Sequence, residues 1–200
     1  MTIVVYSAPE DEPLTVAQAF SYCHVDDVTT ELATMQILIA SARAYAEQEL
    51  QRKIITQTLD AYFDEFPRYE NNSYPCCFRL PPLQSVTSIS YVDTNGVTQT
   101  LASNQYLVDS VSIPARIAPA YGTYWPSTLT QNNAVKVRFI AGYGDPEDVP
   151  ACVKNWMLVR IKGAWDNRAN LVIGQGFNLT QLPPSMFDSL LDPERVVGRL

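Results

Sequence analysis

The single histidine of the chain limits the catalytic chemistry that it could support. His24 directly follows Cys23, so an imidazole base could serve this thiol, or a cysteine elsewhere in the chain, as nucleophile. A hydrolase triad also requires a carboxylate that orients the imidazole. The other interpretation places His24 at the end of a short helix, a position where the helix dipole favours a histidine. We expect this second role, and therefore no enzyme.

The cysteines are potential zinc ligands, but their spacing is unsuited to the metal. Cys76 and Cys77 are adjacent, which makes tetrahedral chelation by both awkward, and the sequence contains no C-x-x-C pair. Buried thiols of a protein kept in a reducing compartment are the alternative, and this also fits the isolated Cys23 and Cys152. We predict no metal site at these residues.

Two acidic segments and two glycine pairs could instead suggest a cation or a nucleotide. Asp26-Asp27 and residues 145–148 do not match an EF-hand loop, and acids at helix N-termini explain both. Gly142-Tyr143-Gly144 lacks the third glycine of a dinucleotide fingerprint and the Gly-Lys-Ser/Thr of a P-loop. Gly174-Gln175-Gly176 is a weaker candidate still. The sequence thus predicts no cofactor.

Three aromatic residues lie together in a proline-containing segment. Tyr121, Tyr124 and Trp125 are placed between Pro119 and Pro126. Such residues could form a platform for a carbohydrate or a peptide, could contact another subunit, or could fold back on a sheet edge. We expect the last two roles over the first.

The composition bounds the remaining functions. A net charge of −7 and a pI near 4.6 argue against tight nucleic-acid binding, which needs clustered Lys and Arg. Residues 1–6 form too short an apolar stretch for a signal peptide and lack its basic start. No segment of the sequence approaches the length of uninterrupted apolar residues that a membrane-spanning helix needs. A hydrophobic fraction of 46% supports a packed core. We expect a protein that stays in the compartment where it is made, without membrane contact.

Helical patterns begin and end the part of the chain that has clear periodicity. Thr15 and Gln18 form a capping-box pattern before a short helix over 16–23. A second helix is predicted over 30–51, and another after Asp148 that should pack on it. The apolar stripe of the second helix comprises Leu32, Met35, Ile39, Ala42, Ala46 and Leu50.

Strand patterns fill the region between these helices. Asp93-Thr94-Asn95-Gly96 separates two β-rich segments and predicts a hairpin, since Asn-Gly accepts the positive φ of such turns. Strands are predicted over 55–63, 78–80, 86–92, 97–101, 106–109, 116–118 and 134–141. The predicted fold is α+β, a helical bundle with an inserted small antiparallel β domain, either a sandwich or a barrel. Its segments are residues 1–53, 54–148, 149–168 and a C-terminal tail at 169–200.

Several stretches, in this order and spacing, resemble the head–tail connector or adaptor proteins of tailed phages, also called head-completion proteins. The resemblance covers residues 9 to 168. It rests on residues 13–19, 51–58, 80–86, 89–93, 116–119, 125–126, 137–144, 149–150 and 165–168.

The resemblance implies a virion structural protein in the neck, assembled in the bacterial cytoplasm. Such a protein forms a ring, a dodecamer in this interpretation, beneath the portal protein and receives a stopper or tail-completion protein. DNA would pass through its channel without specific binding, for which an acidic chain is suited. The competing hypothesis is a carbohydrate- or peptide-binding β module.

The resemblance implies a contact with the portal protein, which the C-terminal segment reaches in related proteins, but the tail after Arg168 matches no pattern of the family. We expect its apolar residues, together with the three aromatics above, to make protein contacts. These tail residues are Phe187, Leu190, Leu191, Val196, Val197 and Leu200.

Overall fold

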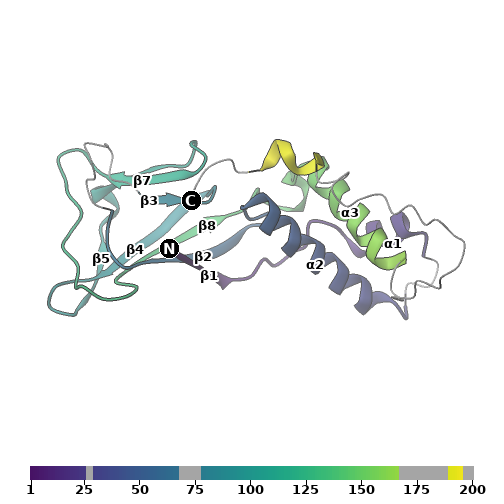
Figure 1. Cartoon of the computed structure of the whole chain (residues 1–200), viewed down its shortest axis with the longest axis horizontal. Helices are drawn as coiled ribbons and strands as arrows, with labels where there is room; N and C mark the ends of the chain where they lie inside the picture. Colours follow the sequence, from purple (N-terminus) through teal and green to yellow (C-terminus); the bar gives the residue numbers. More distant parts are fainter. Residues whose placement is uncertain (26–28, 68–77, 167–188, 196–200) are drawn as a thin grey trace, which may run out of the picture. The chain divides into compact units, whose positions relative to one another are not determined.

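The computed structural model describes residues 1–25, 29–67, 78–166 and 189–195, and it divides into two compact units (Figure 1). A β unit contains the described residues of 1–10 and 55–143, and a helical unit those of 11–54 and 144–195. Both helices and antiparallel sheets are present, which confirms the α+β class. Within the described residues, no helix combines the length and apolarity that crossing a membrane requires.

The β unit contains two antiparallel sheets. The larger has the strand order β1 (Thr2–Ser7), β2 (Gln57–Phe63), β8 (Val135–Ala141), β4 (Ser85–Val92) and β5 (Thr98–Leu101). The smaller has the order β3 (Phe78–Leu80), β7 (Ala115–Pro119) and β6 (Tyr106–Asp109).

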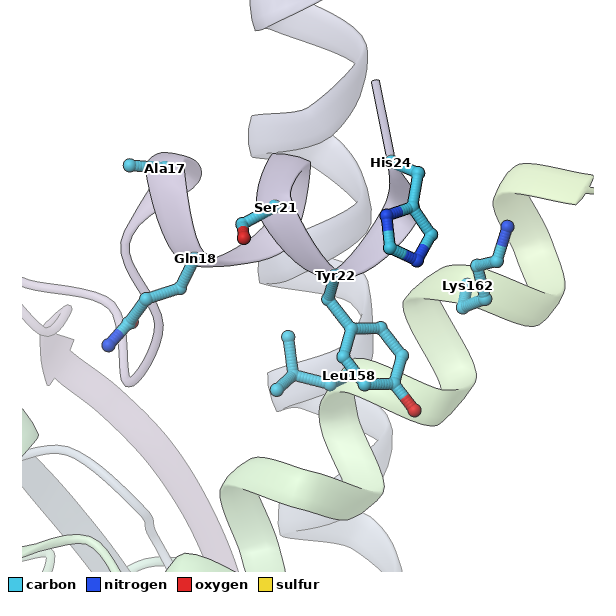
Figure 2. Close-up of a pocket in the computed structure, with 7 residues that line it drawn as sticks. All are labelled: Ala17, Gln18, Ser21, Tyr22, His24, Leu158 and Lys162. Carbon is cyan, nitrogen blue, oxygen red and sulfur yellow. The ribbon is translucent and has the colours of Figure 1, made fainter. Parts of the chain in front are cut away.

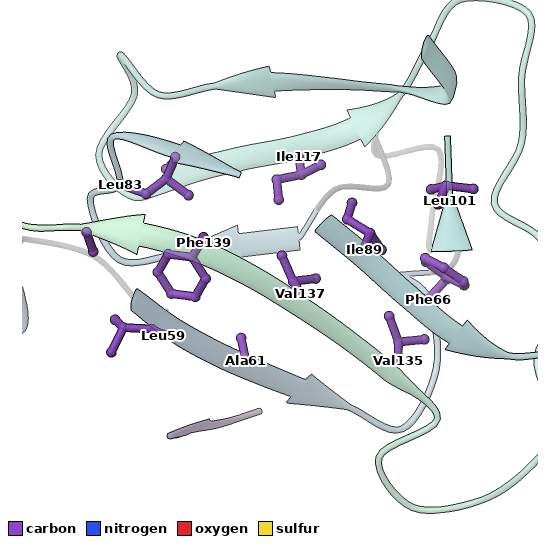
Figure 3. Close-up of a cluster of buried hydrophobic side chains, with 12 residues drawn as sticks. Leu59, Ala61, Phe66, Leu83, Ile89, Leu101, Ile117, Val135, Val137 and Phe139 are labelled. Carbon is purple, nitrogen blue, oxygen red and sulfur yellow. The ribbon is translucent and has the colours of Figure 1, made fainter. Parts of the chain in front are cut away.

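Strand β8 shows why these segments form a layered structure. Its residues alternate between buried and half-buried, as expected for a strand with one face on a core. Val137 faces Ala61 on one side and Ile89 on the other. The buried cluster in Figure 3 also includes Ile117 of the smaller sheet. One core therefore serves both sheets, and because the larger described sheet runs from an edge at β1 to an edge at β5, it is not closed into a barrel.

The first strand was not predicted. Residues 1–53 were expected to form one helical segment, yet β1 pairs with β2, with Ile3 opposite Ala61 and Val5 opposite Leu59. The run Ile3-Val4-Val5-Tyr6 has strong β propensity, but its partner lies far away in the sequence. The N-terminal residues consequently belong to the β unit.

A charged pair holds the face of the large sheet that points away from the core. The Arg138 guanidinium donates to both carboxylate oxygens of Asp60, at 2.7 and 2.8 Å. It also lies 3.4 Å from the ring centre of Tyr6, a cation–π contact. These hydrogen bonds and the charge of Arg138 lower the pKa of Asp60. The central strands and β1 are thereby linked on this face.

The helical unit contains three helices that contact one another: α1 (Val16–Cys23), α2 (Leu32–Leu50) and α3 (Ala151–Asp166). The capping box of Thr15 and Gln18 is present at the start of α1. All residues of the predicted stripe on α2 are buried except Leu32, which is exposed in the first turn. The predicted packing of α3 on α2 is confirmed.

A buried carboxylate near the end of α2 was not anticipated. Glu47 is 8% exposed and accepts hydrogen bonds from Lys53 Nζ at 2.8 Å and from the backbone N–H of Ile54 at 3.3 Å. Arg43, one helical turn earlier, approaches it at 3.4 Å and also pairs with Glu12 at 2.8 Å. A buried charge requires such partners, so this cluster fixes the segments on either side of α2.

Gly142 provides a test of the close packing in the β unit. A Cβ atom there would lie 2.6 Å from the backbone of Ile55, and its φ of +134° is strained for other residues. We expect Gly142→Ala to lower the free energy of unfolding by about 3 kcal/mol or more. Gly163→Ala is the matched control, because a Cβ in that helix meets nothing within 4 Å; it should stabilise by about 0.5–1 kcal/mol. Equal effects in urea denaturation would contradict this account.

The Asp60–Arg138 pair predicts a pH-dependent stability. We expect Asp60→Asn to cost about 2–3 kcal/mol at pH 7, because Arg138 loses its charged partner. Since the pKa of Asp60 is lowered in the folded state, its contribution is complete above the unfolded value of about 3.9. It is lost as the pH falls through the folded pKa. Denaturation at pH 7 and pH 3 checks this: the gap between wild type and variant should narrow at pH 3.

Candidate assembly surfaces

A tight turn presents Tyr121 to solvent. The N–H of Thr123 donates to the carbonyl of Ala120 at 3.0 Å, and Gly122 has a φ of +75°, the positive value that a type II turn requires. The N–H of Ala120 donates to Gln105, which fixes the turn beside β6. Tyr121 is consequently 98% exposed, and Tyr124 is also exposed.

Trp125 has a different environment from its two aromatic neighbours. Its ring stacks on Phe66 with centroids 4.9 Å apart, and Phe66 in turn meets the edge of Tyr91. Trp125 packs against the core of the β unit. The predicted aromatic cluster therefore divides into one residue that folds back on the sheets and two that are accessible to a partner.

A second exposed apolar group lies on the hairpin of β6 and β7. Val111 at its tip is 91% exposed, and Ile113 and Leu107 are exposed as well. The Asp109 carboxylate accepts hydrogen bonds from the side chain and N–H of Ser112 and from the N–H of Val111, and these lower its pKa. The tip therefore has a fixed conformation. Because it is a turn, its sequence has no helical or strand periodicity from which these exposed residues could be predicted.

Strand β1 adds a third apolar surface, whose residues were not among the predicted contact residues. It lies at the edge of the large sheet, and Val4, Val5 and Tyr6 are all exposed. Its β-branched composition was the signal that could have identified it.

The C-terminal tail enters the described structure at a 3₁₀ helix, η3 (Ser189–Glu194), which contacts α2 and α3. Leu191 is fully buried there and Leu190 is half-buried. Ion pairs from Arg52 to Glu194 at 3.2 Å and from Arg195 to Glu49 at 3.3 Å hold this helix.

This packing changes the expectation for the tail. Leu191 completes the core of the helical unit, so its side chain is not accessible to a portal protein. Leu190 is only partly covered. Phe187, Val196, Val197 and Leu200 lie outside the described residues, and their contact role stays a prediction.

An open groove of about 890 Å³ lies between α1 and α3 (Figure 2). His24, which ends α1 with a left-handed backbone, lies beside Tyr22 and Lys162. The Lys162 ammonium pairs with Asp166 at 2.8 Å. The groove is lined by Ala17, Gln18, Ser21, Tyr22, His24, Leu158 and Lys162.

The geometry does not support the enzymatic alternative around His24. Cys23 is buried, and burial raises the pKa of its thiol, which disfavours the thiolate that nucleophilic attack needs. Asp145 and Asp148 cap each other across a short 3₁₀ turn, η2 (Pro146–Asp148), as helix-terminal acids do. In the described part of the chain, no group of three His, Cys, Asp or Glu could hold a metal ion.

The two units together define a fold found in the neck of phage-like particles. No family model and no curated protein matches the sequence. Solved structures do match over 100% of this chain and 98% of theirs.

Three of these structures come from gene transfer agent (GTA) particles. They are the neck of an empty particle computed with C6 symmetry (TM-score 0.74, 18% identity), the virion of a native particle (0.74, 18%) and the neck of a native particle computed with C12 symmetry (0.71, 20%). At this identity the likeness establishes a common fold.

Leu191 tests the role of the packed tail segment. We expect Leu191→Ala to destabilise the helical unit by about 2–4 kcal/mol, since it leaves a cavity beneath η3. Leu190→Ala, on the half-buried neighbour, is the matched control and should cost about 1 kcal/mol. Thermal unfolding of the full chain measures both. Similar losses for the two variants would show that η3 does not pack as described.

Proposed function

We propose that this chain is a structural, non-enzymatic protein of a virion neck, and specifically a head–tail connector or adaptor. The observation that carries the proposal is the fold match over the whole chain, which spans both the β unit and the helical unit. The protein would lie between a portal protein and a stopper or tail-completion protein.

Self-association into a ring follows from the same likeness. The similar structures were computed with C6 and C12 symmetry, which supports a ring of repeated copies, and we propose a dodecamer. Rings need two unlike surfaces on each copy. The β unit offers separate exposed apolar groups at β1, at the β6–β7 tip and at Tyr121 and Tyr124.

The distribution of charge supports a channel through which DNA passes. Among the described residues, the helical unit contains 11 acidic and 7 basic residues, whereas the β unit contains 6 and 4. Both units are therefore net acidic, and the excess of acids is larger in the helical unit. Repulsion between these acids and phosphates would let DNA move without being retained.

The decisive experiment mixes the purified chain with the portal protein of the same particle and determines the mass and symmetry of the product. We expect a complex with twelve copies of the chain, and no retention of duplex DNA at about 50 mM salt. A monomer that ignores portal but binds glycans through Tyr121 and Tyr124 would overturn the proposal. So would tight, salt-sensitive DNA binding.

A portal contact by the tail is tested with a variant that spares η3. Val196→Ser, Val197→Ser and Leu200→Ser are combined, while Leu191 and the ion pairs of η3 stay intact. We expect weaker portal binding with unchanged thermal stability. Wild-type binding by this variant would remove the end of the tail from the proposed interface.

A further inference from the structure

Strand β1 has an outer edge that no described strand covers. It is the first strand of the large sheet and pairs only with β2 among the described strands. Its residues other than Ile3 are exposed, and it contains neither a charged residue nor a proline. Folded proteins usually protect such edges with lysine, proline or a covering segment, because unpaired N–H and C=O groups accept a further strand.

The sheet also holds this edge in a defined position. The Tyr6 ring contacts the Arg138 guanidinium, which is fixed by Asp60. Four ladder positions, from Thr2–Tyr62 to Val5–Leu59, keep a continuous register before it shifts near Ser7. A preorganised edge loses less conformational entropy when it pairs.

The same unit presents a second, unlike edge at β6. This strand ends the smaller sheet and pairs only with β7 among the described strands. Leu107 is 61% exposed and Val108 is 39% exposed. Its one charged residue, Asp109, accepts a hydrogen bond from the Ser112 hydroxyl and forms an ion pair with Arg116 at 4.0 Å.

Strand β5, the other edge of the large sheet, is a poorer partner for β1. Its exposed residues are Thr98, Gln99 and Thr100, and Gln99 donates to Asp93 at 3.1 Å. It therefore offers no exposed apolar side chain opposite Val4 and Tyr6. Pairing of β1 with β1 of another copy would use one surface twice and would close at a dimer.

We propose that the edge of β1 pairs with the edge of β6 on a neighbouring copy of the chain. This inference rests on the proposed ring, whose successive contacts must join two different surfaces. Backbone pairing supplies the hydrogen bonds, and Val4, Val5, Leu107 and Val108 supply the apolar contact. The occupant of the β1 edge is thus a second copy of the same protein.

Hydrogen exchange of the full chain, as monomer and as ring with or without portal, tests the pairing directly. We expect the amides of residues 2–7 and 106–109 to exchange at least about tenfold more slowly in the ring, while those of 98–101 are unchanged. A ring in which β1 and β6 exchange as in the monomer overturns the pairing but leaves the proposed neck function intact. Protection of β5 in place of β6 would overturn the choice of partner strand.

Substitutions at exposed edge residues provide an independent measure. Val4→Lys and Leu107→Lys should each raise the protein concentration needed for ring formation at least about tenfold, since lysine protects an edge from pairing. Val97→Lys, at a residue 52% exposed near the β4–β5 turn, is the matched control and should assemble as wild type. Circular dichroism of each monomer verifies folding.

The outcomes separate the two proposals. Unaltered assembly of both edge variants contradicts the pairing, and a wild-type chain that forms no ring even on portal contradicts the proposed function as well.

Discussion

The structure of the β unit depends on the position of β8 between β2 and β4. One face of β8 supplies Val135, Val137 and Phe139 to the core that both sheets share. Arg138 lies on its other face, where it binds Asp60 of β2 and the ring of Tyr6 on β1. These contacts link β8 to both strands on this side of the sheet. More than sixty residues separate β8 from β2 in the sequence. Pairing of these two strands therefore has to bring distant parts of the chain together before either face of β8 is buried.

The helical unit is held by a different combination of forces. The three helices contact one another, Trp156 and Met157 of α3 are fully buried, and charged groups hold the ends of the elements. Glu47 links α2 to Ile54, and Arg52 and Arg195 attach η3. Segments that would otherwise be irregular connections thereby acquire fixed positions. The two units differ in the surfaces that they offer. Acidic residues exceed basic ones more strongly in the described helical unit, whereas the β unit has more exposed apolar residues and has open strand edges.

This separation suits the proposed function, in which the chain would bind its own copies while DNA passes nearby. The exposed apolar groups belong largely to the β unit, where strand edges add geometry to hydrophobic contact. The larger excess of acids among the described residues belongs to the helical unit, and the proposed channel would use its repulsion of phosphate. The proposed neck function needs both properties in one chain, and neither needs a catalytic group.

The sequence by itself determined the local features. The Thr15–Gln18 cap, the buried stripe of α2 and the alternation of β8 follow from short-range spacing, which is why their elements were predicted correctly. Tertiary structure decided what depends on distant partners. Strand β1 exists because β2 is available to it, and Leu191 is buried because α2 and α3 are already packed. Trp125 turns inward because Phe66 lies beside it, whereas Tyr121 has only a tight turn behind it. No periodicity in the sequence records such long-range contacts.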